Sequence, residues 1–91
     1  MYAALIKLTI DPQFAPQAAI TFTEKILPRV KNASGFVAGY WVDPVEEEGF
    51  GFLLFESVED AKSAAPPAFD WTAPGVTIKK FDIRRVAVSI P

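Results

Sequence analysis

Few side chains in this sequence could carry out chemistry, and what is absent narrows the choice. The chain has no cysteine and no histidine. It therefore lacks thiolate nucleophiles, cysteine metal sites and the commonest general base near neutral pH. The remaining catalytic candidates are hydrogen-bond donors, each able to stabilise a developing oxyanion beside it in a dry cavity. They are Lys7, Tyr40, Trp41 and Arg84.

Each of these candidates also has a plainer structural interpretation. Trp41 is typical of an aromatic residue at a subunit interface, and Arg84 of a solvated charge on a strand. Lys7 lies in a short apolar run, where its stem can cover apolar surface while its ammonium reaches water. A tyrosine such as Tyr40 is commonly a packed ring with one satisfied hydroxyl. The spacing of these residues, and of Asn32, matches no catalytic motif.

Aromatic side chains form the second group of candidates, as ligands for an apolar small molecule. They are Tyr2, Trp41, Phe52, Phe69 and Trp71. Phe69 and Trp71 lie in residues 66–75, a segment that also holds three prolines. They could form a rigid lid over a pocket or a plug that fills it, and the sequence favours neither.

The charged clusters are less specific. Residues 46–48 are three glutamates, which we expect in a solvated turn, because a metal site would need a second group of ligands. Residues 79–80 and 84–85 are basic and flank Asp82. This stripe could steer an anionic ligand, or it could discourage uncontrolled pairing at a sheet edge. No metal site is predicted.

Length and composition predict one folded domain spanning residues 1–91. Hydrophobic residues make up 51% and aromatic residues 13% of the chain, which excludes an intrinsically disordered protein. The net charge of −2 gives no basic surface for a nucleic acid. No apolar run approaches the ~20 residues of a membrane span, and the start does not resemble a targeting segment. We therefore expect a soluble, cytoplasmic protein with no nucleic-acid or membrane partner.

Apolar alternation and turn residues predict four strands. They are expected at Tyr2–Ile10, 35–43, 49–56 and 76–90. Two helices are expected, at 15–31 and at 57–65. Ser57 can cap the second helix by accepting a hydrogen bond from an amide of its first turn. Pro28 should kink the first helix or end it early. The order β-α-β-β-α-β predicts an α+β, ferredoxin-like fold: a four-stranded antiparallel sheet with both helices on one face.

Two of these strands are apolar on both faces, although the helices can cover only one face of the sheet. We expect Phe36, Ala38, Tyr40 and Val42 to oppose Val37, Gly39 and Trp41, and Phe50, Phe52 and Leu54 to oppose Gly51, Leu53 and Phe55. Each large apolar side chain left in water forfeits roughly 1.5–3 kcal/mol. The pattern therefore predicts a homodimer that pairs sheet against sheet around a two-fold axis.

The chain resembles the dimeric α/β-barrel superfamily, and in particular its antibiotic-biosynthesis monooxygenase-like members. The resemblance is carried by the element order, by residues 26–31 running into Ser34-Gly35-Phe36, and by residues 54–61 at the second strand-to-helix junction. It implies a small apolar pocket between helices and sheet or within the dimer barrel. Some members are cofactor-free oxygenases whose aromatic substrate supplies the electrons. Others bind haem through histidine, which this chain lacks, so we expect no cofactor.

These observations predict a small homodimer that binds an apolar or aromatic small molecule, with activity as a cofactor-independent monooxygenase or isomerase. The alternative is a non-catalytic module of the same fold, used for ligand binding or assembly. A roomy cavity holding a polar side chain would favour the enzyme. A cavity filled by Phe52, Trp41 and Trp71 would favour the module.

Overall fold

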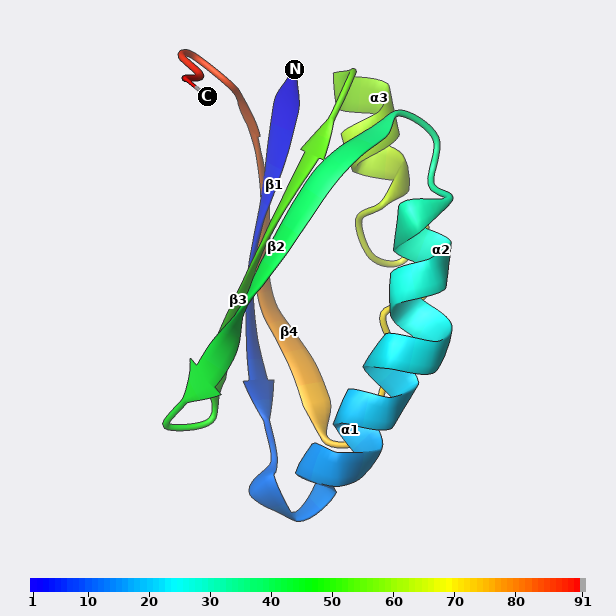
Figure 1. The fold of residues 1–91 in the computed structure, drawn as a ribbon, viewed down its shortest axis with the longest axis vertical. Coiled ribbons are helices and arrows are strands. Elements are labelled where there is room, and N and C mark those ends of the chain that lie inside the picture. Colours follow the sequence, from blue (N-terminus) through cyan, green and yellow to red (C-terminus); the bar gives the residue numbers. More distant parts are fainter. Residues whose placement is uncertain (91) are drawn as a thin grey trace.

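The molecule consists of one antiparallel sheet and one helical layer. The structure is a computed structural model, and it describes residues 1–90. The strands are β1 (Tyr2–Ile10), β2 (Phe36–Val45), β3 (Glu48–Phe55) and β4 (Val76–Arg85), in the order β2-β3-β1-β4. A long helical segment joins β1 to β2, and α3 (Val58–Ser63) follows β3. Both lie on the same face of the sheet (Figure 1). The predicted ferredoxin-like arrangement is confirmed for the single chain.

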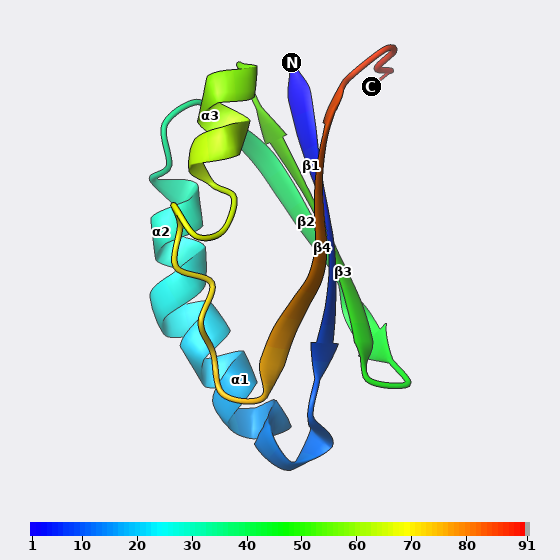
Figure 2. The same cartoon turned by 180° about the vertical axis from the view of Figure 1, so that it is seen from behind.

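The central strand β1 follows the predicted alternation. Ala4, Ile6 and Leu8 are buried under the helices. Leu5 is 39% exposed on the other side, which we call the open face. The sheet therefore has one covered and one bare surface, and the bare surface is visible on the side away from the helices (Figure 2).

A bulge in β2 places Phe36 on the other face of the sheet from the one that the sequence predicts. The pairing of β2 with β3 steps out of register between Phe36 and Ala38. Phe36 consequently packs edge-on against Phe55, 5.9 Å between ring centroids, in the helix-covered core. The prediction that Phe36 shares the face of Tyr40 is wrong, because the extra residue of a bulge reverses the alternation.

The long helix does not end at Pro28. It runs through η1 (Pro12–Phe14), α1 (Ala15–Thr21), the π-helical turn η2 (Phe22–Ile26) and α2 (Leu27–Lys31). Pro28 cannot donate to a carbonyl one turn earlier, and the helix accommodates it by widening into the π turn just before it. The expected irregularity is present, but the early end is not.

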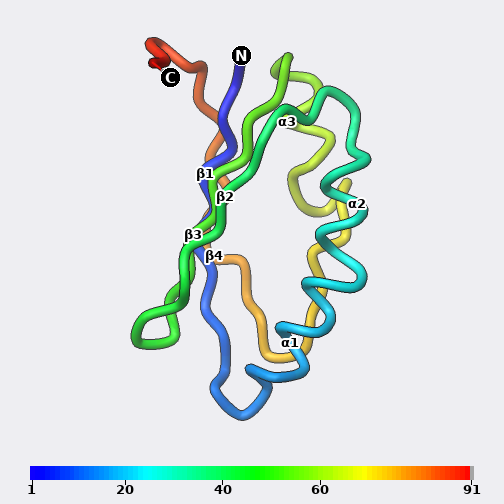
Figure 3. Tube along the Cα trace, viewed as in Figure 1, coloured from blue at the N-terminus to red at the C-terminus, as the bar shows by residue number. Residues whose placement is uncertain are grey.

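The second half of the chain follows the predicted order with one shorter element. The hydroxyl of Ser57 accepts a hydrogen bond from the amide of Asp60 at 3.1 Å, as expected for a helix cap. The segment 66–75 then returns beside the long helix to β4 (Figure 3). β4 ends at Arg85, whereas the sequence predicts a strand to residue 90. The last backbone hydrogen bond between this end of the chain and β1 runs from the Val86 amide to the Met1 carbonyl.

The core lies between the helical layer and the sheet. Its largest fully buried side chains are Ile6, Ile26, Leu53 and Phe55. Burial of a large aliphatic or aromatic side chain contributes roughly 1.5–3 kcal/mol, so these residues fix the distance between the two layers. Toward the hairpin end of the sheet the filling is incomplete, and there the candidate site lies.

Candidate functional site

A cavity of about 430 Å³ lies between the long helix and the hairpin end of the sheet. Phe22 and Ile26 line it from the helix, and Trp41, Leu8 and Ile78 from three strands. Most of the remaining lining is aliphatic or alanine, so the space suits an apolar ligand. We call it the helix–sheet cavity.

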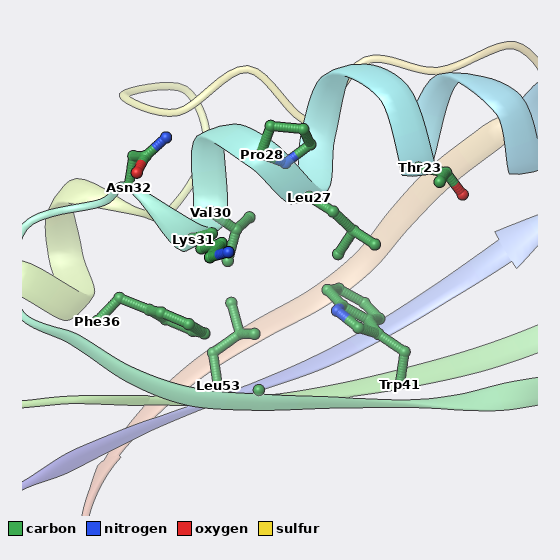
Figure 4. A pocket seen from close by; sticks show the side chains of 10 residues that line it. Thr23, Leu27, Pro28, Val30, Lys31, Asn32, Phe36, Trp41 and Leu53 are labelled. Carbon is green, nitrogen blue, oxygen red and sulfur yellow. The ribbon is translucent and has the colours of Figure 1, made fainter.

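A second hollow, the edge groove, adjoins it on the side of the edge strand β2. Its volume is about 580 Å³, and Leu27, Val30 and Leu53 are among its lining residues. Figure 4 shows Trp41 rising from the sheet opposite Leu27, at one end of this groove. Trp41 and Thr23 line both hollows, so the indole stands at the boundary between them.

A glycine makes room for this indole. Gly51 lies directly opposite Trp41 on β3, and a Cβ added there would fall on the six-membered part of the Trp41 ring. Phe22 meets the same indole edge-on from η2, at 4.7 Å between centroids and an interplanar angle of 85°. The ring is therefore fixed between the strand beneath it and the helix above it.

The wall opposite β2 is built by Trp71 from the segment 66–75. Trp71 is only 6% exposed, and its indole N–H donates to the carbonyl of Ala64 at 2.7 Å. Its ring lies 5.9 Å from that of Trp41 and 4.7 Å from that of Phe69. Of the two interpretations of this segment, the geometry is closer to the rigid lid than to the plug, because Trp71 forms a fixed wall of a cavity that is not filled.

Arg29 fastens this segment to the helix. Its guanidinium donates to the carbonyls of Lys25 and Asp70, at 3.0 and 3.2 Å, and lies 5.4 Å from the centre of the Phe69 ring. Hydrogen bonds from the side chain and the amide of Thr72, with the nearby Arg29 charge, lower the pKa of Asp70. Asp70 therefore stays ionised beside Arg29 at neutral pH.

Polar groups at the cavity are few. Thr23 and Asp43 are lining residues that the sequence did not single out. Asp43 follows Trp41 by two residues on a strand, so strand periodicity could have placed both on one face. The Trp41 indole N–H, by contrast with that of Trp71, has no hydrogen-bond acceptor within residues 1–90. It is the donor available to a ligand.

The other catalytic candidates lie away from Trp41. Lys7 lies on the open face and pairs with Glu48 at 3.0 Å. Tyr40 is 66% exposed there, and Arg84 lies 3.8 Å from Asp82 on the same side. The sheet backbone separates these three side chains from the helix–sheet cavity, so they cannot act together with Trp41 within one chain.

The predicted ligand-binding aromatics are divided in the same way. Trp41 and Trp71 line the helix–sheet cavity, whereas Phe52 is on the open face. Tyr2 packs against the far end of the core, and Phe69 backs Trp71 from behind. Asn32 lines the edge groove (Figure 4).

The charged clusters show no metal-binding geometry. Glu46 and Glu47 have positive φ angles of 50° and 71° in the tight turn between β2 and β3. Within residues 1–90, no group of three or more acidic side chains is arranged to hold a metal ion. Lys80 is paired with Asp82 at 3.2 Å. Over the same residues, no helix has the length and apolar character needed to cross a bilayer.

Comparison with known proteins supports the fold and goes no further. No family model matches the sequence, and no curated protein matches it. Among solved structures, the chain is similar to the crystal structure of a point mutant of MhuD with two manganese protoporphyrin IX molecules bound per active site. The TM-score is 0.68 at 17% identity, over 100% of this chain and 99% of that one. The fold that the resemblance implies is thus confirmed for the single chain.

Proposed function

We propose that this protein is a homodimer that binds an aromatic small molecule in the helix–sheet cavity and oxidises it as a cofactor-free monooxygenase-like enzyme. The observation that carries the proposal is an open apolar cavity beside a tryptophan whose indole N–H has no protein acceptor within residues 1–90. A buried tryptophan normally satisfies its N–H, as Trp71 does. Trp41 is only partly buried, so its N–H is accessible to a ligand that can accept the hydrogen bond.

The cavity supplies binding energy chiefly through apolar contact. Removal of apolar surface from water is worth about 25 cal/mol per Å², and the walls contributed by Phe22, Trp41 and Trp71 favour a flat aromatic ring. The cavity is small enough to exclude most water once a ring occupies it. A hydrogen bond from Trp41 then acts in a low dielectric, where it is stronger than in solution.

These groups suit oxidation of an electron-rich phenol or a related ring. Trp41 stabilises the deprotonated oxygen, and Asp43 at the rim accepts the proton. The substrate supplies the electrons and dioxygen is the oxidant. The ring carbon opposite the hydroxyl loses its hydrogen, and the hydroxyl loses its proton. One atom of dioxygen becomes the new carbonyl oxygen on that carbon, the other leaves as water with these two hydrogens, and the phenol becomes a quinone.

The lining of this cavity offers no protein ligand for the iron of a haem. A haem iron takes its protein ligand from histidine, cysteine, methionine or tyrosine. The chain has no histidine or cysteine, and none of Met1, Tyr2 and Tyr40 lines the cavity. We therefore route no step through a haem, although the similar MhuD structure contains manganese protoporphyrin IX.

The open face supports the dimer. Tyr40, Val42 and Phe50 are 66%, 60% and 48% exposed there, beside Leu5 and Phe52. These side chains form a groove of about 420 Å³ together with Lys7, Lys80 and Asp82. A contiguous apolar surface of this kind marks an interaction site, and a two-fold axis lets one surface cover its own copy. In that dimer Lys7, Tyr40 and Arg84 would face a space bounded by both subunits.

A non-catalytic binding module is the second candidate, favoured by one observation. Asp43 is the sole carboxylate lining the helix–sheet cavity in the described chain, and it is exposed at the rim. Within residues 1–90 no polar or charged residue is buried, so the cavity holds no buried general base. A module would bind the same class of ligand without consuming oxygen.

The test is a thermal-shift screen of phenols and hydroquinones, followed by oxygen-uptake measurements with the compounds that bind. The enzyme proposal expects stabilisation together with oxygen uptake that falls strongly in Trp41→Phe. Binding without oxygen uptake by any compound would support the module. If no compound stabilises the protein, the cavity is not a binding site for this class.

A further inference from the structure

The main-chain carbonyl of Thr23 has no amide partner in its own helix. In an α-helix it would accept from the N–H of Leu27, four residues later. That N–H donates instead to the carbonyl of Phe22, because η2 is a π-helical turn. The next amide along would be that of Pro28, and proline has no N–H. The Thr23 oxygen is therefore left as an unused acceptor.

This oxygen lies beside the two hollows. Thr23 lines both the helix–sheet cavity and the edge groove, and Leu27, one turn later, lines the edge groove. Helical carbonyls point along the axis toward the C-terminal end, so the Thr23 oxygen is directed from Thr23 toward Leu27. Figure 4 shows Thr23 and Leu27 on the sheet-facing side of the helix, across from Trp41. Thr23, which carries the unused acceptor, thus lies at the boundary of the two hollows, as Trp41 does.

We propose that the Thr23 carbonyl selects ligands that carry a hydrogen-bond donor, namely aromatic molecules with a free hydroxyl group. The inference rests on the proposed function and narrows its substrate class. A hydroxyl that donates to a carbonyl keeps its proton, so it differs from the oxygen that ionises beside Trp41. The favoured substrate is a hydroxylated aromatic with a second oxygen substituent, rather than an ether or a bare hydrocarbon.

The proposed preference for hydroxylated ligands arises from the main chain, because the π turn and Pro28 together leave the Thr23 carbonyl without a donor in the helix. A carbonyl that lacks its helical partner must find another donor, and π turns inside α-helices frequently occur at functional sites. Replacement of Pro28 by alanine supplies the missing N–H at that position. The Thr23 carbonyl can then be satisfied within the helix, and a ligand hydroxyl gains less by reaching it.

The experiment compares a methoxynaphthol with the corresponding dimethoxynaphthalene as probes, each titrated by calorimetry into three proteins. In the unmodified protein we expect the methoxynaphthol, which has the free hydroxyl, to bind about tenfold more tightly, the worth of one net hydrogen bond. In Pro28→Ala the ratio should fall toward one, with the amide introduced at position 28 protected from hydrogen exchange. In Thr23→Val, which keeps the carbonyl and removes the hydroxyl, the ratio should persist.

Other results overturn the inference in distinguishable ways. Equal binding of both probes to the unmodified protein contradicts donor selection but leaves the cavity as a binding site. Loss of the preference in Thr23→Val assigns it to the hydroxyl instead of the carbonyl, and a preference that survives in Pro28→Ala also contradicts the carbonyl. If neither probe binds, the proposed function fails and this inference fails with it.

Discussion

The indole of Trp41 lies over Gly51, its direct cross-strand neighbour, in the space that a side chain on β3 would otherwise occupy. The pair explains how a large aromatic ring fits between a sheet and a helix without pushing them apart. It also fixes the ring at the boundary between the helix–sheet cavity and the edge groove. The position of the ligand-facing donor therefore depends on a residue that has no side chain.

Gly51→Ala should displace the indole of Trp41. The added Cβ would meet the ring and not a flexible chain end, so we expect a loss of about 1–3 kcal/mol in the free energy of unfolding. Thermal or denaturant unfolding measures it, and a change in tryptophan emission reports the ring. Gly49→Ala is the matched control, because the nearest atom to its Cβ would be a methyl group at the flexible end of Leu8, at 3.0 Å. Equal effects of the two substitutions would contradict the account.

Trp71→Phe should cost more stability than Trp41→Phe. The first substitution leaves the buried Ala64 carbonyl without its 2.7 Å hydrogen bond, a loss of about 1–3 kcal/mol. The second removes an N–H that no atom of residues 1–90 accepts, so its main effect should fall on ligand binding. Urea unfolding of both variants measures the difference. The reverse order would show that Trp41 has the structural role and Trp71 the free donor.

Phe52→Glu should prevent formation of the proposed homodimer. Phe52 is 37% exposed on the apolar open face, and a sheet-to-sheet dimer would bury a charged carboxylate there in place of an apolar ring. Sedimentation velocity at micromolar concentration measures the change. Ile20→Glu is the control, since Ile20 is 57% exposed on the helical layer. A monomeric unmodified protein would rule out the dimer directly.

Arg29→Lys should loosen the wall of the helix–sheet cavity. Lysine cannot reproduce the planar donor pair to Lys25 and Asp70 or the contact with the Phe69 ring. Because Arg29 is exposed, we expect a loss of only about 0.5–1 kcal/mol. Amide exchange in residues 69–72 should quicken while exchange in β1 stays unchanged. Unchanged exchange in both segments would remove the proposed role of Arg29.

Asp70 should contribute a small pH-dependent stabilisation. Hydrogen bonds from Thr72, assisted by Arg29, lower its pKa in the folded protein below the unfolded value. The contribution is therefore fully present above the unfolded pKa and is lost as the pH falls through the folded pKa. A carboxyl titration by NMR should give a value below the ordinary range for aspartate. In Asp70→Asn the acid side of the stability profile should lose this component.

The sequence predicts the strands and the cap well because their signals are local. Alternation in β1 and the hydroxyl of Ser57 act within a few residues, and both behave as expected. The misplacement of Phe36 arises from a bulge, which depends on pairing with a distant strand. The helix survives Pro28 because packing against the sheet outweighs one lost bond.

The candidate site is harder to foresee because it depends on which face of the sheet each residue occupies. Lys7, Tyr40 and Arg84 are chemically suitable, yet the helical layer covers the opposite face. Trp41 and Trp71 are distant in sequence, and only the return of segment 66–75 along the helix brings them together. Thr23 gives no sequence signal, since its unused carbonyl results from a π turn.

The most direct test of the central claim follows the two indole N–H signals of the protein by NMR while a naphthol is added, with Trp41→Phe used for assignment. We expect a saturable shift of the Trp41 signal and a smaller change at Trp71, whose N–H remains bonded to Ala64. Saturable binding that leaves the Trp41 signal unmoved, or no binding at all, would contradict the helix–sheet cavity as the ligand site.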